Sequence, residues 1–215
     1  MTQQQIANIT IEKWLTGWAL SRHLPLPIPY RSGFKVDVGY KEQIARYVFP
    51  ALHRDFFDLA NTIEQPWIHL KVCAPPGALK QDLPERWVIL PQGYFMHCYH
   101  EMPAPRKSLG NEYALLIEKD AATYVVKIMH QQGELAASGR IVLVDDIAVF
   151  DQVVTDPQHQ RKGLASIVLK ELEKIALAED ISEYCLVATD EGKLLYESLG
   201  WEMRAYYTSV VITGE

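Results

Sequence analysis

The sequence predicts an α/β protein (α+β in some schemes) with a mixed central sheet flanked by helices. Strand-like and helix-like segments alternate through the second half of the chain, over residues 113–213. Apolar residues make up 48% and charged residues 22% of the 215 positions, as in ordinary globular proteins. A chain of this length buries roughly 70% of the surface of its unfolded form, so it can build a real core.

Composition and charge exclude several classes of protein. The balance of residues excludes a disordered chain, a collagen-like fibre and a disulfide-rich miniprotein. With 21 basic against 27 acidic residues the net charge is −6, and the longest basic cluster is Arg161-Lys162, so we expect no nucleic-acid partner. Cys73, Cys98 and Cys185 form no CxxC pair, which argues against a structural zinc site and favours a reducing compartment. We expect no membrane partner and a cytoplasmic location, because neither a signal peptide nor a long apolar run is visible.

The first half of the chain is predicted in pieces. Residues 1–24 favour a helix, and the alternating prolines of residues 24–29 favour an extended arm. Residues 41–63 carry apolar side chains near helical spacing, and Pro50 splits them into two predicted helices. The strand candidates are residues 34–38, 67–72, 87–90 and 94–99. The segment 101–110 has two prolines and a glycine, so we predict an N-terminal subdomain over 1–105 and a second domain over 110–215.

The second half has a clearer pattern. Asp145-Asp146 lies between two β-branched runs and predicts a hairpin turn, and Gly200 ends a short helix. No internal sequence repeat is visible. The predicted strands are residues 113–117, 122–130, 136–144, 147–155, 184–188 and 204–213, and the predicted helices are residues 163–179 and 192–199.

The segment most informative about chemistry joins a strand to a helix. The strand stops at Pro157, a polar loop follows, and the helix begins after Gly163. The N–H groups of a helix's first turn lack intrahelical partners and lie at the positive end of the dipole. Small residues let a phosphate approach them, and Arg161 and Lys162 add positive charge. Neither GxxxxGK[ST] nor GxGxxG is present, so the residues alone predict only a phosphate-bearing ligand.

Two motifs resemble the GCN5-related N-acetyltransferase (GNAT) superfamily. Gln160, Gly163 and Ala165 fit its acyl-CoA motif, Arg/Gln-x-x-Gly-x-Gly/Ala, after the usual proline at 157. Residues 195–201 (LYESLGW) look like its "LYEKLGF" element, one helix and one strand downstream. The resemblance covers residues 110–213 and implies the acyl-CoA N-acyltransferase fold. The first half looks like the N-terminal extension of larger members or a degenerate second copy of the fold, and these alternatives stay open.

The resemblance implies a site for acetyl-CoA as co-substrate. In this family the strand before the loop splays from its neighbour at a bulge and holds the pantetheine arm, and the loop's N–H groups bind the pyrophosphate. The bland alternative is a helix entrance with surface charges. The residues implied in binding are Val153, Val154, Thr155, Gln160, Arg161, Lys162, Gly163, Leu164, Ala165 and Ser166.

Two residues are candidates for catalysis. Tyr196 resembles the family's general acid, which protonates the leaving thiolate, although it could be a tyrosine packed on its helix. Asp151 is the candidate general base, because alternation along a strand puts it on the same face as Val153; otherwise it is a solvated or salt-bridged aspartate. Asp145 and Asp146 are assigned to the turn.

Other chemistry-bearing residues favour structural roles. Residues 97–101 (HCYHE) do not gather ligands for a metal and lack the third group of a nucleophilic site; they line an acceptor pocket or pack in a strand. We expect no metal. Trp14, Trp18, Trp67 and Trp87 are core residues or shape an apolar acceptor pocket.

The resemblance implies an acetyl-CoA-dependent N-acetyltransferase (acyltransferase, EC 2.3.1 class) that acts on a primary amine. We expect a small-molecule acceptor rather than a lysine-rich protein, because the sequence has no acidic run to form a groove for one and its extra N-terminal half can enclose a pocket. The alternative is a non-catalytic acyl-CoA-binding or regulatory module, and a longer acyl donor also stays open. Family members are often dimers, so a homodimer is compatible with the sequence.

Overall fold

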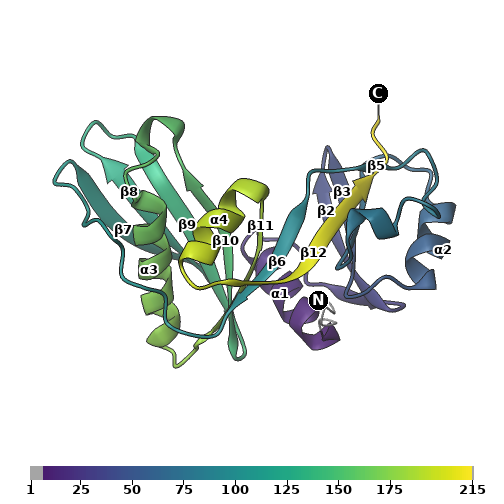
Figure 1. Cartoon of the computed structure of the whole chain (residues 1–215), viewed down its shortest axis with the longest axis horizontal. Coiled ribbons are helices and arrows are strands. Elements are labelled where there is room, and N and C mark those ends of the chain that lie inside the picture. Colours follow the sequence, from purple (N-terminus) through teal and green to yellow (C-terminus); the bar gives the residue numbers. More distant parts are fainter. Residues whose placement is uncertain (1–6, 215) are drawn as a thin grey trace.

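The computed structural model describes residues 7–214 and contains one continuous twelve-stranded sheet. Figure 1 shows two β-rich bodies side by side, joined by long central strands. The strand order is β1-β2-β3-β4-β12-β6-β11-β10-β9-β8-β7, and β5 pairs with β12 beside this path. The strands are β1 (Ile28–Tyr30), β2 (Gly33–Tyr40), β3 (Gln43–Phe49), β4 (Ile68–Val72), β5 (Val88–Ile89), β6 (Gly93–Cys98), β7 (Tyr113–Asp120), β8 (Thr123–His130), β9 (Leu135–Val144), β10 (Ile147–Thr155), β11 (Glu183–Ala188) and β12 (Glu202–Val211). The helices are α1 (Asn8–Leu20), α2 (Arg54–Thr62), η1 (Pro76–Ala78), η2 (Pro157–His159), α3 (Leu164–Leu177) and α4 (Asp190–Ser198).

The second half forms a β-meander with a helical crossover. Strands β7 to β10 are antiparallel neighbours, and α3 then carries the chain to β11, which runs parallel to β10. The predicted turn at Asp145 is confirmed, with a φ of 52° that suits a tight hairpin. Gly139 on β9 allows α3 to approach closely, because a Cβ there would lie 2.7 Å from Val168. The predicted mixed sheet flanked by helices is confirmed.

The first half contains a hairpin where we predicted a helix. Residues 43–49 form β3, paired with β2 on one side and with β4 on the other, so that Arg46 lies between Val36 and His69. The apolar residues here have helical spacing, but tertiary pairing with two strands overrides this local pattern. The later part of the prediction is confirmed, since α2 begins at Arg54, after Pro50.

The chain repeats one topology without repeating its sequence. In the first half β2 and β3 are antiparallel, and α2 leads to β4, parallel to β3. In the second half β9 and β10 are antiparallel, and α3 leads to β11, parallel to β10. We call β2-β3-α2-β4 the first unit and β9-β10-α3-β11 the second unit.

The two units interlock through three elements. β12 pairs with β6 along its first part and with β4 and β5 along residues 208–211. β6 precedes the boundary predicted at 105, yet it lies between β11 and β12. α1 packs against β9 and β10, where a Cβ on Gly17 would come within 2.5 Å of Val149. The segment 1–105 therefore supplies a strand and a helix to the second body. None of the described helices is both long and apolar enough to cross a membrane.

Candidate functional site

The parallel strands β10 and β11 separate part-way along their length. Residues 147–149 pair with 183–185, and no pair forms beyond them. β10 runs on paired only with β9, through a bulge that follows Asp151. Gln152 in the bulge has a φ of 50°, and a bulge bends its strand away from the ladder. The backbone of residues 153–155 therefore borders a gap between the strands, which has the form that the resemblance implies.

A loop shaped for an anion closes the end of this gap. Asp156 accepts a hydrogen bond from the N–H of Gln158 at 2.9 Å and starts η2. The chain then turns at Arg161 and Gly163, whose φ angles are 63° and 85°. α3 begins at Leu164, and no side chain caps its N-terminus. Its first-turn N–H groups are therefore free to bind an anion.

A pocket of about 460 Å³ lies against the loop. Arg106, Lys107 and Arg161 line it together with Gly163, Ser166 and the end of α4. The Lys107 ammonium also donates to the carbonyl of Arg161 at 3.3 Å, which holds the segment before β7 over the loop. Three cations around an uncapped helix N-terminus suit a ligand with more than one phosphate. We call this the phosphate pocket.

The remaining residues of the predicted motif occupy different places. The Lys162 ammonium donates to the hydroxyl of Tyr113 at 2.8 Å and does not line the phosphate pocket. Gln160 is exposed, Ala165 is half-buried, and Leu164 is buried in the core beneath α3.

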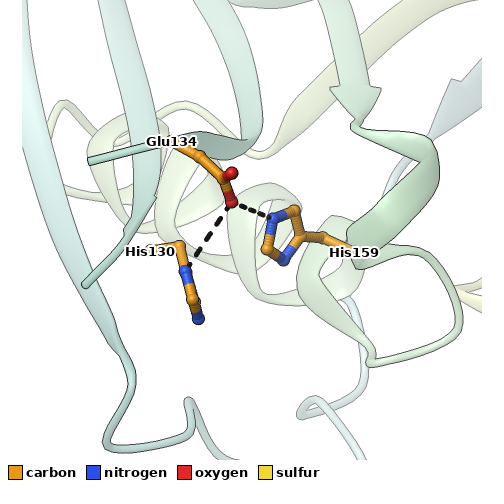
Figure 2. Close-up of side chains that lie close together, drawn as sticks. All are labelled: His130, Glu134 and His159. Atoms are coloured by element: carbon orange, nitrogen blue, oxygen red, sulfur yellow. Dashed lines mark hydrogen bonds and ion pairs between the residues drawn. The ribbon is translucent and has the colours of Figure 1, made fainter. Parts of the chain in front are cut away.

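His130, Glu134 and His159 form a cluster that includes the last residue of η2, next to the loop (Figure 2). His159 of η2 lies 3.3 Å through Nε2 from Glu134, and its Nδ1 lies 2.9 Å from the hydroxyl of Tyr113. His130 lies 3.7 Å through Nδ1 from the same Glu134 oxygen. The three ligand atoms lie within 4.8 Å of one another, so they could hold a metal ion. The sequence did not indicate this set, because the β8–β9 hairpin and η2 bring it together.

A second pocket, of about 610 Å³, lies between the two units. Its walls come from α1, β3, β4, β10, β11 and β12, from the start of α4 and from residues 90–93. Asp151 on β10 and Val187 on β11 both line it, so the gap between these strands opens into it. We call it the inter-unit pocket.

Two buried cations form one wall of the inter-unit pocket. Arg46 and Lys71 are each 8% exposed. The Arg46 guanidinium lies 3.5 Å from the ring centroid of Trp18, and the Lys71 ammonium donates to the hydroxyl of Ser209 at 2.8 Å. Burial lowers the pKa of Arg46 to about 10. It also lowers the pKa of Lys71 well below its ordinary value, and the charge of Arg46 lowers it further.

Asp151 lines this pocket, and its carboxylate forms an ion pair with Arg22. Its carboxylate accepts hydrogen bonds from the Arg22 guanidinium and from the hydroxyl of Ser21, the latter at 2.6 Å. The predicted shared face with Val153 is wrong, because the bulge breaks the alternation between them. Asp151 faces α1, whereas Val153 packs toward α3 in the neighbourhood of Gly139.

Tyr196 lies on the helix that borders both pockets. The first residues of α4 line the inter-unit pocket, and Ser198 and Leu199 line the phosphate pocket. Tyr196 is 8% exposed, packs against Trp201, and has no hydrogen-bond partner for its hydroxyl among the described residues. Burial raises the pKa of Tyr196, and the negative charge of Asp151 raises it further.

The other predicted candidates are structural in this arrangement. None of residues 97–101 lines either pocket. His97 is buried with its Nδ1 3.4 Å from Glu183, and the thiol of Cys98 donates to the carbonyl of His100 at 3.1 Å. Trp14, Trp18 and Trp87 are core residues, and Trp14 and Trp18 also line the inter-unit pocket. Trp67 is half-buried and lines neither pocket.

Comparison with known proteins decides the family. The profile of the acetyltransferase (GNAT) family matches residues 86–201, which are 116 of the 215 residues. The chain belongs to this family. No curated protein sequence matches it.

Solved structures of GNAT proteins share the fold over nearly the whole chain. A GCN5-related N-acetyltransferase from Kribbella flavida has a TM-score of 0.67 at 14% identity, covering 99% of this chain and 97% of that one. A GNAT-family protein from Novosphingobium aromaticivorans DSM 12444 has a TM-score of 0.63 at 16% identity, covering 98% and 100%. A tandem GNAT protein from the clavulanic acid biosynthesis pathway has a TM-score of 0.53 at 12% identity, covering 96% of each chain. The predicted GNAT fold is confirmed.

Membership gives the site its general chemistry, since GNAT acetyltransferases move an acyl group from acyl-CoA to small-molecule or peptide acceptors. The residues present fit acyl-CoA. The gap beside residues 153–155 suits an extended arm, and the uncapped α3 N-terminus with Arg161 and Lys107 suits a pyrophosphate. The φ of Gly163, 85°, is the conformation that glycine adopts without strain.

Sequence reasoning missed the cationic pocket wall supplied by the first unit. Arg46 and Lys71 each interrupt a strand of otherwise mostly apolar residues, QIARYVF and IHLKV. A cation in the middle of such a strand is a usable signal, because a buried charge needs a partner or a function. It could not show that both residues face one pocket.

Proposed function

We propose that this GNAT protein transfers the acetyl group of acetyl-CoA to the primary amine of a small molecule. The observation that carries the proposal is the gap between β10 and β11, which opens into the inter-unit pocket and ends at the uncapped N-terminus of α3. Acetyl-CoA supplies an activated thioester. The inter-unit pocket holds the acceptor, and walls from both units limit the acceptor to a small molecule.

Tyr196 is the proposed general acid. The amine nitrogen forms a bond to the thioester carbonyl carbon, the C–S bond breaks, and the sulfur takes the phenolic proton of Tyr196. The raised pKa keeps this phenol protonated at neutral pH. A buried site raises the pKa of the leaving thiol as well, which favours the protonated sulfur. The transfer leaves one anion, the Tyr196 phenolate, and the proton that the attacking amine loses to the base balances the one needed to restore the phenol.

Asp151 is the proposed general base, since its carboxylate lines the inter-unit pocket beside the gap. The ion pair with Arg22 holds the carboxylate in place. An Asp151→Asn variant separates the roles. The variant loses the ion pair and lowers Tm in either case, so kcat decides: a base predicts a fall in kcat, whereas a purely structural ion pair predicts an unchanged kcat.

A thermal-shift titration with acetyl-CoA tests the donor site. Ligand at about 100 times its Kd adds about 2.7 kcal/mol, which raises Tm by roughly 5–10 °C at this chain length. Gly163→Glu should abolish the shift, because it adds strain and negative charge to the anion cradle. Gly39→Glu is the matched control, since Gly39 has a φ of 73° and open space around it.

Each outcome of the titration is informative. A shift lost only in Gly163→Glu supports the donor site, and CoA release with a panel of amines then tests the transfer. No shift with acetyl-CoA, CoA or longer acyl-CoAs contradicts the proposal. A shift without turnover of any amine favours the alternative, a non-catalytic acyl-CoA-binding or regulatory module.

A further inference from the structure

The cationic wall of the inter-unit pocket is built by adjacent strands of the first unit. Arg46 on β3 pairs with His69, and Lys71 follows two residues later on β4, so Arg46 and Lys71 are diagonal neighbours on one face of the sheet. Both are more than nine-tenths buried, and both line the pocket. α1 covers this face, with Trp18 beneath the Arg46 guanidinium.

Neither cation has a carboxylate partner among the described residues. Lys71 donates to Ser209, a neutral hydroxyl. Asp151, the carboxylate on the neighbouring wall, is held by Arg22 and Ser21. Two unneutralised buried charges on one wall are costly for the fold. An anionic group of a bound ligand would pair with these cations and offset that cost, so the wall is suited to bind an anion.

The start of α4 gives the same pocket an acidic side. Asp190 and Glu191 line it, and Asp190 accepts a hydrogen bond from the hydroxyl of Tyr94 at 2.6 Å. Both acidic residues are exposed at the rim. The pocket therefore has charges of opposite sign on two sides, with buried cations on β3 and β4 and exposed carboxylates at the start of α4.

We infer that the acceptor is an amine that also carries a carboxylate, as amino acids do. The carboxylate binds Arg46, Lys71 and the Ser209 hydroxyl, and the amino group lies toward β11 and α4, where the gap opens. A guanidinium can bind the two oxygens of a carboxylate in parallel, which fixes the ligand's orientation. This assignment of substrate class rests on the proposed acyl transfer, whereas the anion subsite does not.

Matched pairs of acceptors test the inference. L-phenylalanine is compared with phenethylamine, and L-leucine with isoamylamine, by CoA release. We expect kcat/KM to favour the amino acid at least tenfold, mainly through KM. Lys71→Met and Arg46→Gln should reduce this preference to about one, whereas Arg54→Gln, whose side chain is 91% exposed, should keep it. Equal use of both members of each pair, or preference surviving in Lys71→Met, would overturn the inference.

A binding experiment separates this inference from the transfer reaction. L-phenylalanine and N-acetyl-L-phenylalanine are titrated in a thermal-shift assay without acyl-CoA. Protection of the wild type that is lost in Lys71→Met supports the anion subsite even if no amine is acetylated, and the transfer proposal alone then fails. Turnover of amines with no carboxylate preference supports the transfer and overturns the subsite. A preference for phosphoethanolamine over both ethanolamine and the amino acids would overturn the carboxylate assignment.

Discussion

The two units share one topology, and only the second has the geometry of an acyl-CoA site. In the first unit β3 and β4 pair at every position from residues 45 and 68 to residues 49 and 72. In the second unit β10 and β11 pair at three positions and then separate. The β3–β4 pairing has no register shift, whereas the bulge at Gln152 bends β10 where it leaves β11. The order of strands is shared by the two units, and the bulge accompanies the gap in the second unit alone.

The units also differ in the partners of one lysine each, the half-buried Lys170 and the buried Lys71. In the second unit Lys170 lies 2.6 Å from the fully buried Glu173, which also accepts a hydrogen bond from the backbone N–H of Met102. In the first unit Lys71 donates to the Ser209 hydroxyl and lies 5.8 Å from the centroid of the Tyr207 ring, and no carboxylate among the described residues pairs with it. A paired charge belongs to the structure, whereas an unpaired one beside a pocket indicates a ligand.

The largest expected effect is on turnover and tests whether catalysis depends on Tyr196 of α4, which follows the second unit along the chain, and not on a tyrosine of the first unit. Tyr196→Phe should lower kcat by about 100- to 10,000-fold, the range for loss of a general acid, and leave the acetyl-CoA thermal shift intact. Tyr47→Phe, in the half-buried tyrosine of β3, should change neither. Unchanged turnover in Tyr196→Phe would remove the general acid from the mechanism and favour a binding module.

The next largest expected effect is the difference in unfolding free energy between variants of Lys170 and Lys71. Lys170→Met leaves the Glu173 carboxylate buried without its partner and should cost about 3–5 kcal/mol of unfolding free energy. Lys71→Met removes an unpaired cation and should leave stability unchanged or raise it, because no carboxylate is stranded. Urea denaturation of both variants measures the difference. Equal losses would mean that Lys71 has a structural partner and would weaken the anion subsite.

Acid stability compares one histidine from each body. Burial lowers the pKa of His97 to about 4, and it does the same for the half-buried His69. Between pH 4 and pH 6.5 such a histidine is mostly neutral in the folded protein and mostly protonated in the unfolded chain. The stability it contributes is therefore complete above pH 6.5 and is lost as the pH falls toward 4.

For the deeply buried His97 this loss amounts to about 3 kcal/mol. His97→Gln should flatten the decline of unfolding free energy between pH 6.5 and 4, and His69→Gln should flatten it less. His53→Gln, at an exposed position, is the control. An unchanged acid profile in His97→Gln would show that other groups govern acid unfolding.

Much of the second unit could be predicted from the residues because its signals are local. Alternation marked the strands of the meander, and the stripe of Leu164, Val168 and Leu172 marked α3. The first unit was harder, since residues 43–49 have helical spacing and become a strand only between two partners. Their conformation depends on pairing that no local window contains.

The sequence by itself determined the fold class, the loop at Gly163 before a helix, and the helix that carries Tyr196, because each depends on residues close together in the chain. Only the tertiary structure decided what surrounds them. Packing β3 and β4 against α1 placed Arg46 and Lys71 on one pocket wall, and the bulge turned Asp151 toward Arg22 and away from Val153. Contacts between distant segments form only when the chain folds, so they create the inter-unit pocket without a local sequence signal.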